Sequence, residues 1–159
     1  MVYDQAHNIA KFENHCLGGQ MIRLLVHRKG ATRAFPPGHG EVVEKFRDIG
    51  QPVIIPGSMG SRSYVLRGTE QGSALTFASS AHGAGRRLSR HQAIKFSAQT
   101  DVRERLKQNG VLVFSLHEQG LREEIPEAYK NIDAVVDVTV ASGISEKVAR
   151  LRPLVVIKG

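Results

Sequence analysis

A histidine set among small residues and followed by arginines is the feature of this sequence with the clearest chemical potential. It lies in the run Ala81-His82-Gly83-Ala84-Gly85-Arg86-Arg87-Leu88-Ser89-Arg90. Glycines let backbone N–H groups converge on an anion, and a helix starting near Gly85 would add its dipole. On such a helix, Arg86 and Arg90 would share one face and reach the same phosphate. A neutral imidazole has a free lone pair, so His82 is a candidate nucleophile toward phosphorus. The alternative is a glycine-rich turn holding a buried, hydrogen-bonded histidine.

The bulk composition describes a globular chain of ordinary domain size. It has 159 residues, 41% of them hydrophobic, which is enough for one domain with a core. No apolar run approaches the roughly 20 residues that span a bilayer. The first residues resemble no secretory leader, so we expect a cytoplasmic protein with no membrane partner. A single cysteine, Cys16, excludes an intramolecular disulfide and any multi-cysteine metal site in this chain.

The charge balance favours polyanionic partners. Lys and Arg number 22 against 15 Asp and Glu, for a formal net charge of +7. Such a balance indicates RNA, DNA or nucleotides, although a merely basic surface is the alternative. Basic residues cluster beside glycines, whereas many acidic residues lie in 41–48 and 118–127. A positive side with glycine-rich loops suits phosphate binding.

The pattern of apolar runs and caps predicts mixed secondary structure. Strands are expected over 22–27, 53–55, 64–66, 75–78, 111–115 and 154–157. Helices are expected over 41–48, over 88–96, over 102–108 after a Thr100-Asp101 cap, and through 128–136 after Pro126. Because these elements do not alternate strictly, the fold class is α+β, with mixed sheets and short helices in one domain over 1–159.

Seven collinear segments of the chain resemble the RtcB family of RNA ligases. They are His7–Lys11, Val26–Ala34, Pro52–Gly60, Ser63–Leu66, His82–Arg86, Pro126–Asp133 and Val156–Gly159. Together they cover essentially the whole chain, in the order and rough spacing of the family's C-terminal part. The resemblance therefore implies the C-terminal, nucleophile-bearing part of the RtcB fold.

The resemblance also implies a reaction. The family joins an RNA 2′,3′-cyclic phosphate or 3′-phosphate end to a 5′-hydroxyl end, as in tRNA splicing and RNA repair, using GTP and manganese. The histidine that becomes guanylylated matches His82. GMP then moves to the RNA 3′-phosphate and is displaced by the 5′-hydroxyl. Phosphoryl transfer needs neutralisation of the phosphate oxygens, for which Lys29, Arg86 and Arg90 are the candidates.

Nucleotide contacts come to this chain through the same resemblance. They fall on Asn8, Pro56, Gly57, Ser58, Met59, Ser63, Gly83, Ala84, Gly85, Tyr129 and Lys158. Tyr129 would stack on guanine, while Lys158 and Ser63 would bond the base edge. Taken by themselves, Tyr129 reads equally as a core or surface aromatic, and Lys158 as a solvated charge.

The implied metal site is incomplete in this chain. His7 matches a manganese ligand of the family, but the Asp, Cys and two further His that complete its ion pair belong to the family's N-terminal part. Cys16 and the remaining histidines match none of those positions. One imidazole cannot hold the ion. We therefore expect that this chain alone binds GTP weakly and is guanylylated slowly or not at all.

Three functional readings follow. The first is the nucleophile-bearing half of a GTP-dependent RNA ligase, working on tRNA halves or broken RNA with a separate N-terminal half. The second is a truncated, non-catalytic module that binds nucleotides and RNA phosphates. The third is an unrelated phosphate-binding enzyme. Self-association is a further expectation, because missing segments leave apolar surface uncovered.

Overall fold

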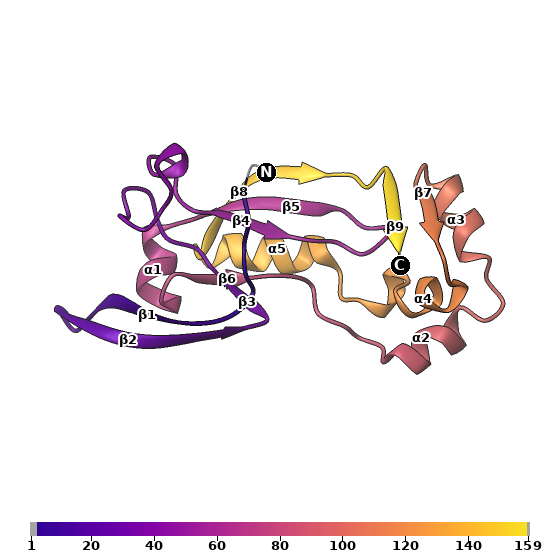
Figure 1. The fold of residues 1–159 in the computed structure, drawn as a ribbon, viewed down its shortest axis with the longest axis horizontal. Coiled ribbons are helices and arrows are strands. Elements are labelled where there is room, and N and C mark those ends of the chain that lie inside the picture. The colour runs from indigo at the N-terminus through magenta and orange to yellow at the C-terminus, as the bar shows by residue number, and fades with distance from the viewer. Residues whose placement is uncertain (1–2, 159) are drawn as a thin grey trace.

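A three-stranded antiparallel sheet backed by one helix forms the middle of the molecule (Figure 1). The computed structural model describes residues 3–158, so Gly159, the last residue of the terminal motif, lies outside the described residues. The sheet has the order β4 (Pro52–Ile55), β5 (Ser63–Gly68) and β8 (Ser145–Leu151), and the helix is α5 (Ile132–Ala141). The expected α+β class, with small sheets and short helices, is confirmed.

Alternating side chains hold the central sheet to its helix. Val53, Ile55, Tyr64 and Leu66 are buried on the inner face of β4 and β5, as a period of two requires. They pack in one cluster with residues of α5, of which Val136 is fully buried. The central layer is therefore a conventional sheet-on-helix core, and its strand ends carry the loops of the site.

A long hairpin projects from one end of the molecule (Figure 1). It pairs β1 (Asn8–Leu17) with β2 (Gln20–Lys29) in antiparallel register, and Asn8 lies opposite Lys29. The connecting glycines, Gly18 and Gly19, both have positive φ, as a two-residue hairpin turn requires. Asn8, the first residue of β1, thus lies beside Lys29, the last residue of β2.

Two short strands connect the hairpin to the rest of the fold. Strand β3 (Ala31–Arg33) pairs antiparallel with β6 (Ser79–Ala81), with Ala31 opposite Ala81. Between them in sequence lie a 3₁₀ turn, η1 (Glu44–Phe46), and the helix α1 (Glu70–Thr76). Pairing with β3 therefore fixes the position of Ala81, the residue at which β6 ends.

A helical lobe forms the other end of the molecule (Figure 1). It contains α2 (Arg90–Phe96), α3 (Val102–Gln108), α4 (Glu118–Glu123), the 3₁₀ turn η2 (Pro126–Ala128), and a parallel pair of strands, β7 (Leu112–Ser115) and β9 (Val155–Lys158). Its core comprises Met59, Ala93, Val102, Leu106, Val111, Leu121, Ile125 and Ala128. Between residues 3 and 158, no helix is long and apolar enough to cross a membrane.

The strand expected over 75–78 is wrong. Thr69 accepts a hydrogen bond from the Gly72 N–H and caps a helix that runs to Thr76. Phe77 and Ala78 then take positive φ, and the strand begins only at Ser79. The expected helix over 41–48 is also wrong, because only the 3₁₀ turn Glu44–Phe46 forms there.

The helix expected to start near Gly85 is wrong as well. Gly85 has a φ of 71°, and the helix begins at Arg90 behind a Ser89–Gln92 capping box. Arg86 therefore lies outside the helix and shares no helical face with Arg90.

Several predicted boundaries shift and six strands and helices are new. The helix predicted through 128–136 divides, since Tyr129 is extended and Asn131 caps α5 from residue 132. Helix α3 has the predicted bounds and its Asp101 cap. Strands β1, β3, β6 and β8 and helices α1 and α4 were not predicted. The strands predicted over 22–27, 53–55, 64–66, 111–115 and 154–157 correspond to β2, β4, β5, β7 and β9.

Candidate functional site

Main-chain pairing brings His82 beside the turn that ends the hairpin. His82 follows β6 directly, and its neighbour Ala81 lies opposite Ala31. Gly30, which precedes Ala31, has a φ of 71° and turns the chain from β2 into β3. A Cβ placed on Gly30 would lie 3.7 Å from His82 Nε2. The backbone of this turn therefore runs along the imidazole ring.

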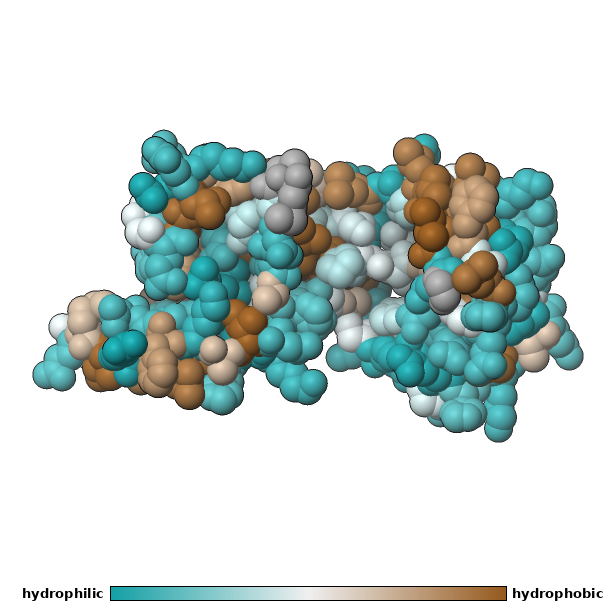
Figure 2. Space-filling view, viewed as in Figure 1, coloured by the Kyte–Doolittle hydropathy of each residue, from teal (hydrophilic) through white to brown (hydrophobic). Residues whose placement is uncertain are grey.

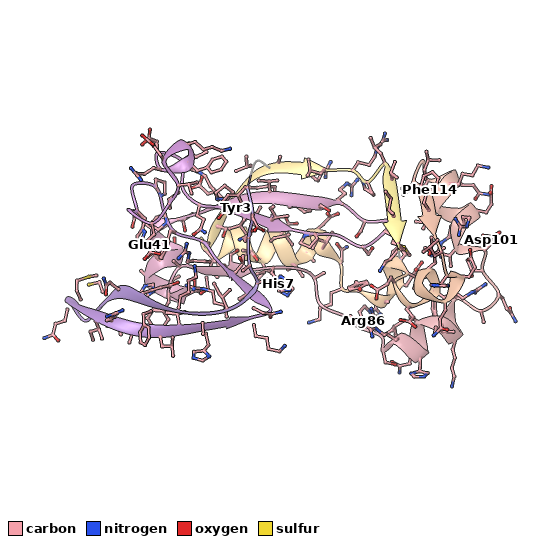
Figure 3. All side chains as sticks on the ribbon, viewed as in Figure 1. Tyr3, His7, Glu41, Arg86, Asp101 and Phe114 are labelled. Atoms are coloured by element: carbon pink, nitrogen blue, oxygen red, sulfur yellow. The ribbon has the colours of Figure 1, made fainter. Side chains whose placement is uncertain are left out.

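A second imidazole stacks on His82. The His7 and His82 rings have centroids 4.6 Å apart and are inclined by 12°. His7 immediately precedes β1 at the base of the hairpin, where Figure 3 labels it. Partial burial lowers the pKa of His82 below its ordinary value, and electrostatic repulsion between the two imidazoles lowers that pKa further. His82 is therefore uncharged at neutral pH, as a nucleophilic imidazole must be.

His82 lies in the wall between two cavities. The larger, which we call the main cavity, has a volume of about 630 Å³. The smaller, of about 370 Å³, includes His7 and Gln5 in its lining. Both cavities are lined by His82 and Pro56. The ring is thus accessible from a cavity of ligand size.

The main cavity collects most of the predicted nucleotide contacts. These come from four separate segments of the chain: Pro56, Gly57, Ser58, Met59, Ser63, His82, Gly83, Ala84, Tyr129 and Lys158. Chain folding thus brings together residues more than 100 positions apart. A binding site formed by these residues requires them to lie around one cavity, as they do here.

The loop between β4 and β5 is shaped by its own hydroxyls. The Gly57 N–H donates to Ser63 Oγ at 3.0 Å, and the Ser58 N–H donates to Ser61 Oγ at 2.6 Å. A Cβ on Gly57 would lie 1.9 Å from the Arg62 carbonyl oxygen, so only glycine fits. Met59 is only 6% exposed and packs in the core of the helical lobe. This loop therefore presents a rigid wall to the main cavity.

Tyr129 is held in place by Arg86. The Arg86 guanidinium lies 4.9 Å from the Tyr129 ring centroid, and its Nη1 donates to the Tyr129 hydroxyl at 3.0 Å. The hydroxyl in turn donates to Glu124 Oε2. Burial raises the pKa of Tyr129, and the Glu124 carboxylate raises it further. The aromatic ring thus has a fixed position in the cavity wall.

Arg86 is committed to protein acceptors. Besides the Tyr129 hydroxyl, it donates to the Glu123 and Leu88 carbonyl oxygens at 2.6 and 3.1 Å and to Glu124 Oε1 at 3.1 Å. Figure 3 shows Arg86 at the junction of the central sheet and the helical lobe. Arg86 therefore acts as a clamp that joins the segment after His82 to residues 123–129, and few of its N–H donors remain for a ligand.

Other predicted residues lie away from the main cavity. Asn8 and Lys29 pair across the base of the hairpin, next to His7 and Gly30. Arg90 has a side chain that is 72% exposed and pairs with Glu123 at 3.6 Å. Neither these three residues nor Gly85 lines the main cavity.

Some residues of the cavity were not predicted as site residues. Lys130 and Arg152 both line it, as does Glu124. Lys130 lies inside the segment 126–133, which carries the family resemblance, so the sequence held a signal from which this residue could have been predicted. Arg152 follows a strand that the sequence did not predict, so nothing indicated its position.

The residues present do not fit a manganese site. Among residues 3–158, no three His, Cys, Asp or Glu side chains gather closely enough to hold a metal ion. The neighbour of the His7 ring is another imidazole, His82, and one or two imidazoles do not suit a hard, oxygen-preferring cation. We therefore derive no chemical step through a metal bound by this chain.

The family model and the similar proteins that match this chain agree on one family. The family model described as tRNA-splicing ligase RtcB matches residues 1–159. Proteins named tRNA-splicing ligase RtcB from Nanoarchaeum equitans and Archaeoglobus fulgidus are 57% and 55% identical over the whole chain, which covers 33% of each. The protein of that name from Methanocaldococcus jannaschii is 52% identical, with 16% of its length covered. The chain thus spans a third or less of the length of these relatives.

Proposed function

We propose, since this chain belongs to the tRNA-splicing ligase RtcB family, that it carries the nucleophile and nucleotide pocket of a GTP-dependent RNA ligase. The substrates would be RNA 2′,3′-cyclic phosphate or 3′-phosphate ends and 5′-hydroxyl ends, as the family resemblance implies. Complete ligation would need the part of the family's chain that this chain does not cover. RNA, GTP and a cytoplasmic location belong to this proposal.

In the proposed first step, a ring nitrogen of His82 attacks the α-phosphorus of GTP. A P–N bond forms, the bond to the β-phosphate oxygen breaks, and pyrophosphate leaves while GMP stays on the ring. The lowered pKa of His82 supports this role because it keeps the lone pair free. The position of the ring in the wall of the main cavity supports in-line access to a bound nucleotide.

The observation that carries the proposal is the convergence of His82, Tyr129, Ser63 and Lys158 on one cavity. Tyr129 would stack on the guanine ring, since Arg86 fixes its position. Ser63 Oγ accepts from the Gly57 N–H, so its O–H is free to donate to the base edge. Lys158 would supply a second donor to that edge.

A non-catalytic binding module is the second candidate. The lack of a three-ligand metal group among the described residues favours it, because phosphoryl transfer without a cation leaves the triphosphate charge unneutralised. Such a module would bind nucleotide and RNA phosphates without forming the His82 adduct.

Exposed apolar faces support a partner that carries the rest of the family's chain. Leu112 and Phe114 on β7 lie opposite Val155 and Ile157 on β9, and all four are at least half exposed. Figure 2 shows hydrophobic side chains gathered over these strands. A face of this kind is covered by another polypeptide or by self-association.

Intact-mass analysis distinguishes the two candidates. The chain is incubated with GTP and Mn²⁺, alone and after mixing with a polypeptide that carries the remaining part of an RtcB relative. A ligase half gains one GMP per chain in the mixture and little or none alone. A binding module gains none in either sample yet binds RNA with strong salt dependence.

A further inference from the structure

Three cations without protein partners surround a second cavity beside the main one. This side cavity has a volume of about 660 Å³ and is lined by Arg87, Lys130 and Arg152. All three residues are exposed. Within residues 3–158, none of these three side chains makes a hydrogen bond or an ion pair, whereas Arg62 and Arg105 nearby are both paired. Unpaired cations around a concave surface mark an anion site.

The acidic residues of the side cavity do not cancel this charge. Glu127 is paired with Arg105 at 2.9 Å. Asp133 accepts from Arg62 at 3.2 Å and from the Tyr64 hydroxyl at 2.5 Å. Each carboxylate is thus already neutralised by a partner of its own. The charge left over in the cavity is that of Arg87, Lys130 and Arg152.

Backbone pairing fixes two of these cations. The Arg87 N–H donates to the Ala128 carbonyl oxygen at 2.8 Å, and the Lys130 N–H donates to the Gly85 carbonyl oxygen at 3.0 Å. The bridge between Arg86 and Tyr129 lies between these two bonds. The segment after His82 and the segment of Tyr129 are therefore locked together, which sets the places from which Arg87 and Lys130 extend.

The side cavity continues into the main cavity. Lys130 and Arg152 line both, as do Ser61, Tyr129 and Pro153. A chain of phosphates entering through the side cavity would pass Arg87, then Lys130 and Arg152, and reach the cavity that holds His82. A positively charged groove that follows the backbone is a usual feature of sites for single-stranded nucleic acid.

We propose that the side cavity binds the backbone phosphates of a single RNA strand through Arg87, Lys130 and Arg152 and leads that strand's end toward His82. This inference rests on the proposed function, since it names the path of the RNA into the same site. The alternative source of phosphate is the triphosphate of GTP, because Lys130 and Arg152 also line the main cavity.

The test compares two triple variants that lose equal charge. In R87Q/K130Q/R152Q the three side-cavity cations are removed. In the control R23Q/R47Q/K95Q three exposed cations that line neither cavity are removed. Binding of a fluorescein-labelled single-stranded RNA 12-mer to each full chain is measured by anisotropy between 50 and 200 mM salt. GTP binding is measured in parallel.

Each phosphate contact on a single strand contributes about 0.7 to the slope of log K against log salt concentration, so three lost contacts lower it by about 2. Over this salt range wild type should lose about 20-fold more RNA affinity than the side-cavity variant. The control should keep nearly the wild-type slope and the wild-type GTP affinity. Equal slopes for the two variants overturn the proposal. Lost GTP binding with unchanged RNA binding also overturns it and assigns the cations to the triphosphate.

A footprint on the wild-type chain covers the case in which the side-cavity variant fails to fold. RNA should protect Lys130 from acetylation and leave Lys95 reactive, whereas equal reactivity of Lys130 with and without RNA overturns the proposal. A steep RNA slope with no GMP adduct at His82 in any mixture would leave the side cavity standing and refute the ligase half. A GMP adduct with equal slopes would do the reverse.

Discussion

Replacing Arg86 by alanine should destabilise the fold by about 3 kcal/mol. Its guanidinium donates to the Glu124 carboxylate, to the Tyr129 hydroxyl, and to two carbonyl oxygens. The Arg86 and Glu124 side chains are 28% and 20% exposed, so their hydrogen-bonded pair is largely shielded from solvent. A charge-assisted bond of this kind contributes roughly 1.5–3 kcal/mol, and the contact with the Tyr129 ring adds about 0.5–1 kcal/mol.

Urea unfolding of wild type, R86A and R86K measures this change. We expect R86K to recover less than half of the loss, since an ammonium group cannot donate to four acceptors in different directions. Arg90→Ala is the matched control from the same motif. Its side chain is 72% exposed and makes one ion pair at 3.6 Å, so the change should stay within about 0.5 kcal/mol.

Equal stabilities of R86A and wild type would refute the interpretation of Arg86 as a clamp. A loss of stability that R86K fully restored would show that charge alone matters at this position. In either case, Arg86 would return to the set of candidate phosphate ligands.

Two further predictions concern ionisable pairs. In an NMR titration His82 should protonate below the ordinary histidine value, and H7Q should raise its pKa by removing a neighbouring charge. Because the pKa of His82 is lower in the folded state, its contribution to the free energy of unfolding is constant above pH 6.5 and falls as the pH drops toward and through the folded-state pKa. An unshifted pKa of His82 in the NMR titration would contradict the burial argument. Burial would raise the pKa of Glu13, but hydrogen bonds from Arg28 and His15 outweigh it and hold that pKa below its ordinary value. Unfolding of R28M, which leaves the Glu13 carboxylate buried, should show a loss of about 3–5 kcal/mol, and a loss under 1 kcal/mol would mean that the pair contributes little. The contribution of Glu13 in wild type should fade as the pH drops through its folded-state pKa.

Local sequence signals predicted the elements whose ends are marked by caps and turns. Asp101 and Asn109-Gly110 bracket α3 correctly, and Pro56 correctly ends β4. The hairpin strand β1 was missed because its inner face carries Glu13 and His15, which are buried as a polar group in which Glu13 binds both Arg28 and His15. An alternating apolar pattern is therefore absent, although the residues are inside.

The sequence supplied candidate site residues but not their arrangement in space. The family resemblance supplied His82, Tyr129 and Lys158, and the structure gathers them on one cavity. The pairing of Arg86 with Arg90 was wrong because a local rule, helical spacing, was applied where Gly85 has positive φ and Ser89 starts the helix. Contacts such as the His7–His82 stack depend on the β3–β6 register, which no local pattern encodes.

Peptide mapping of the GMP adduct tests the central claim most directly. The chain is mixed with the remaining part of an RtcB relative, GTP and Mn²⁺, and digested under mildly alkaline conditions. We predict GMP on the peptide that contains His82, lost in H82Q and retained in H91Q, which replaces an exposed histidine outside both cavities. GMP on any other residue, or an adduct that persists in H82Q, would contradict the account.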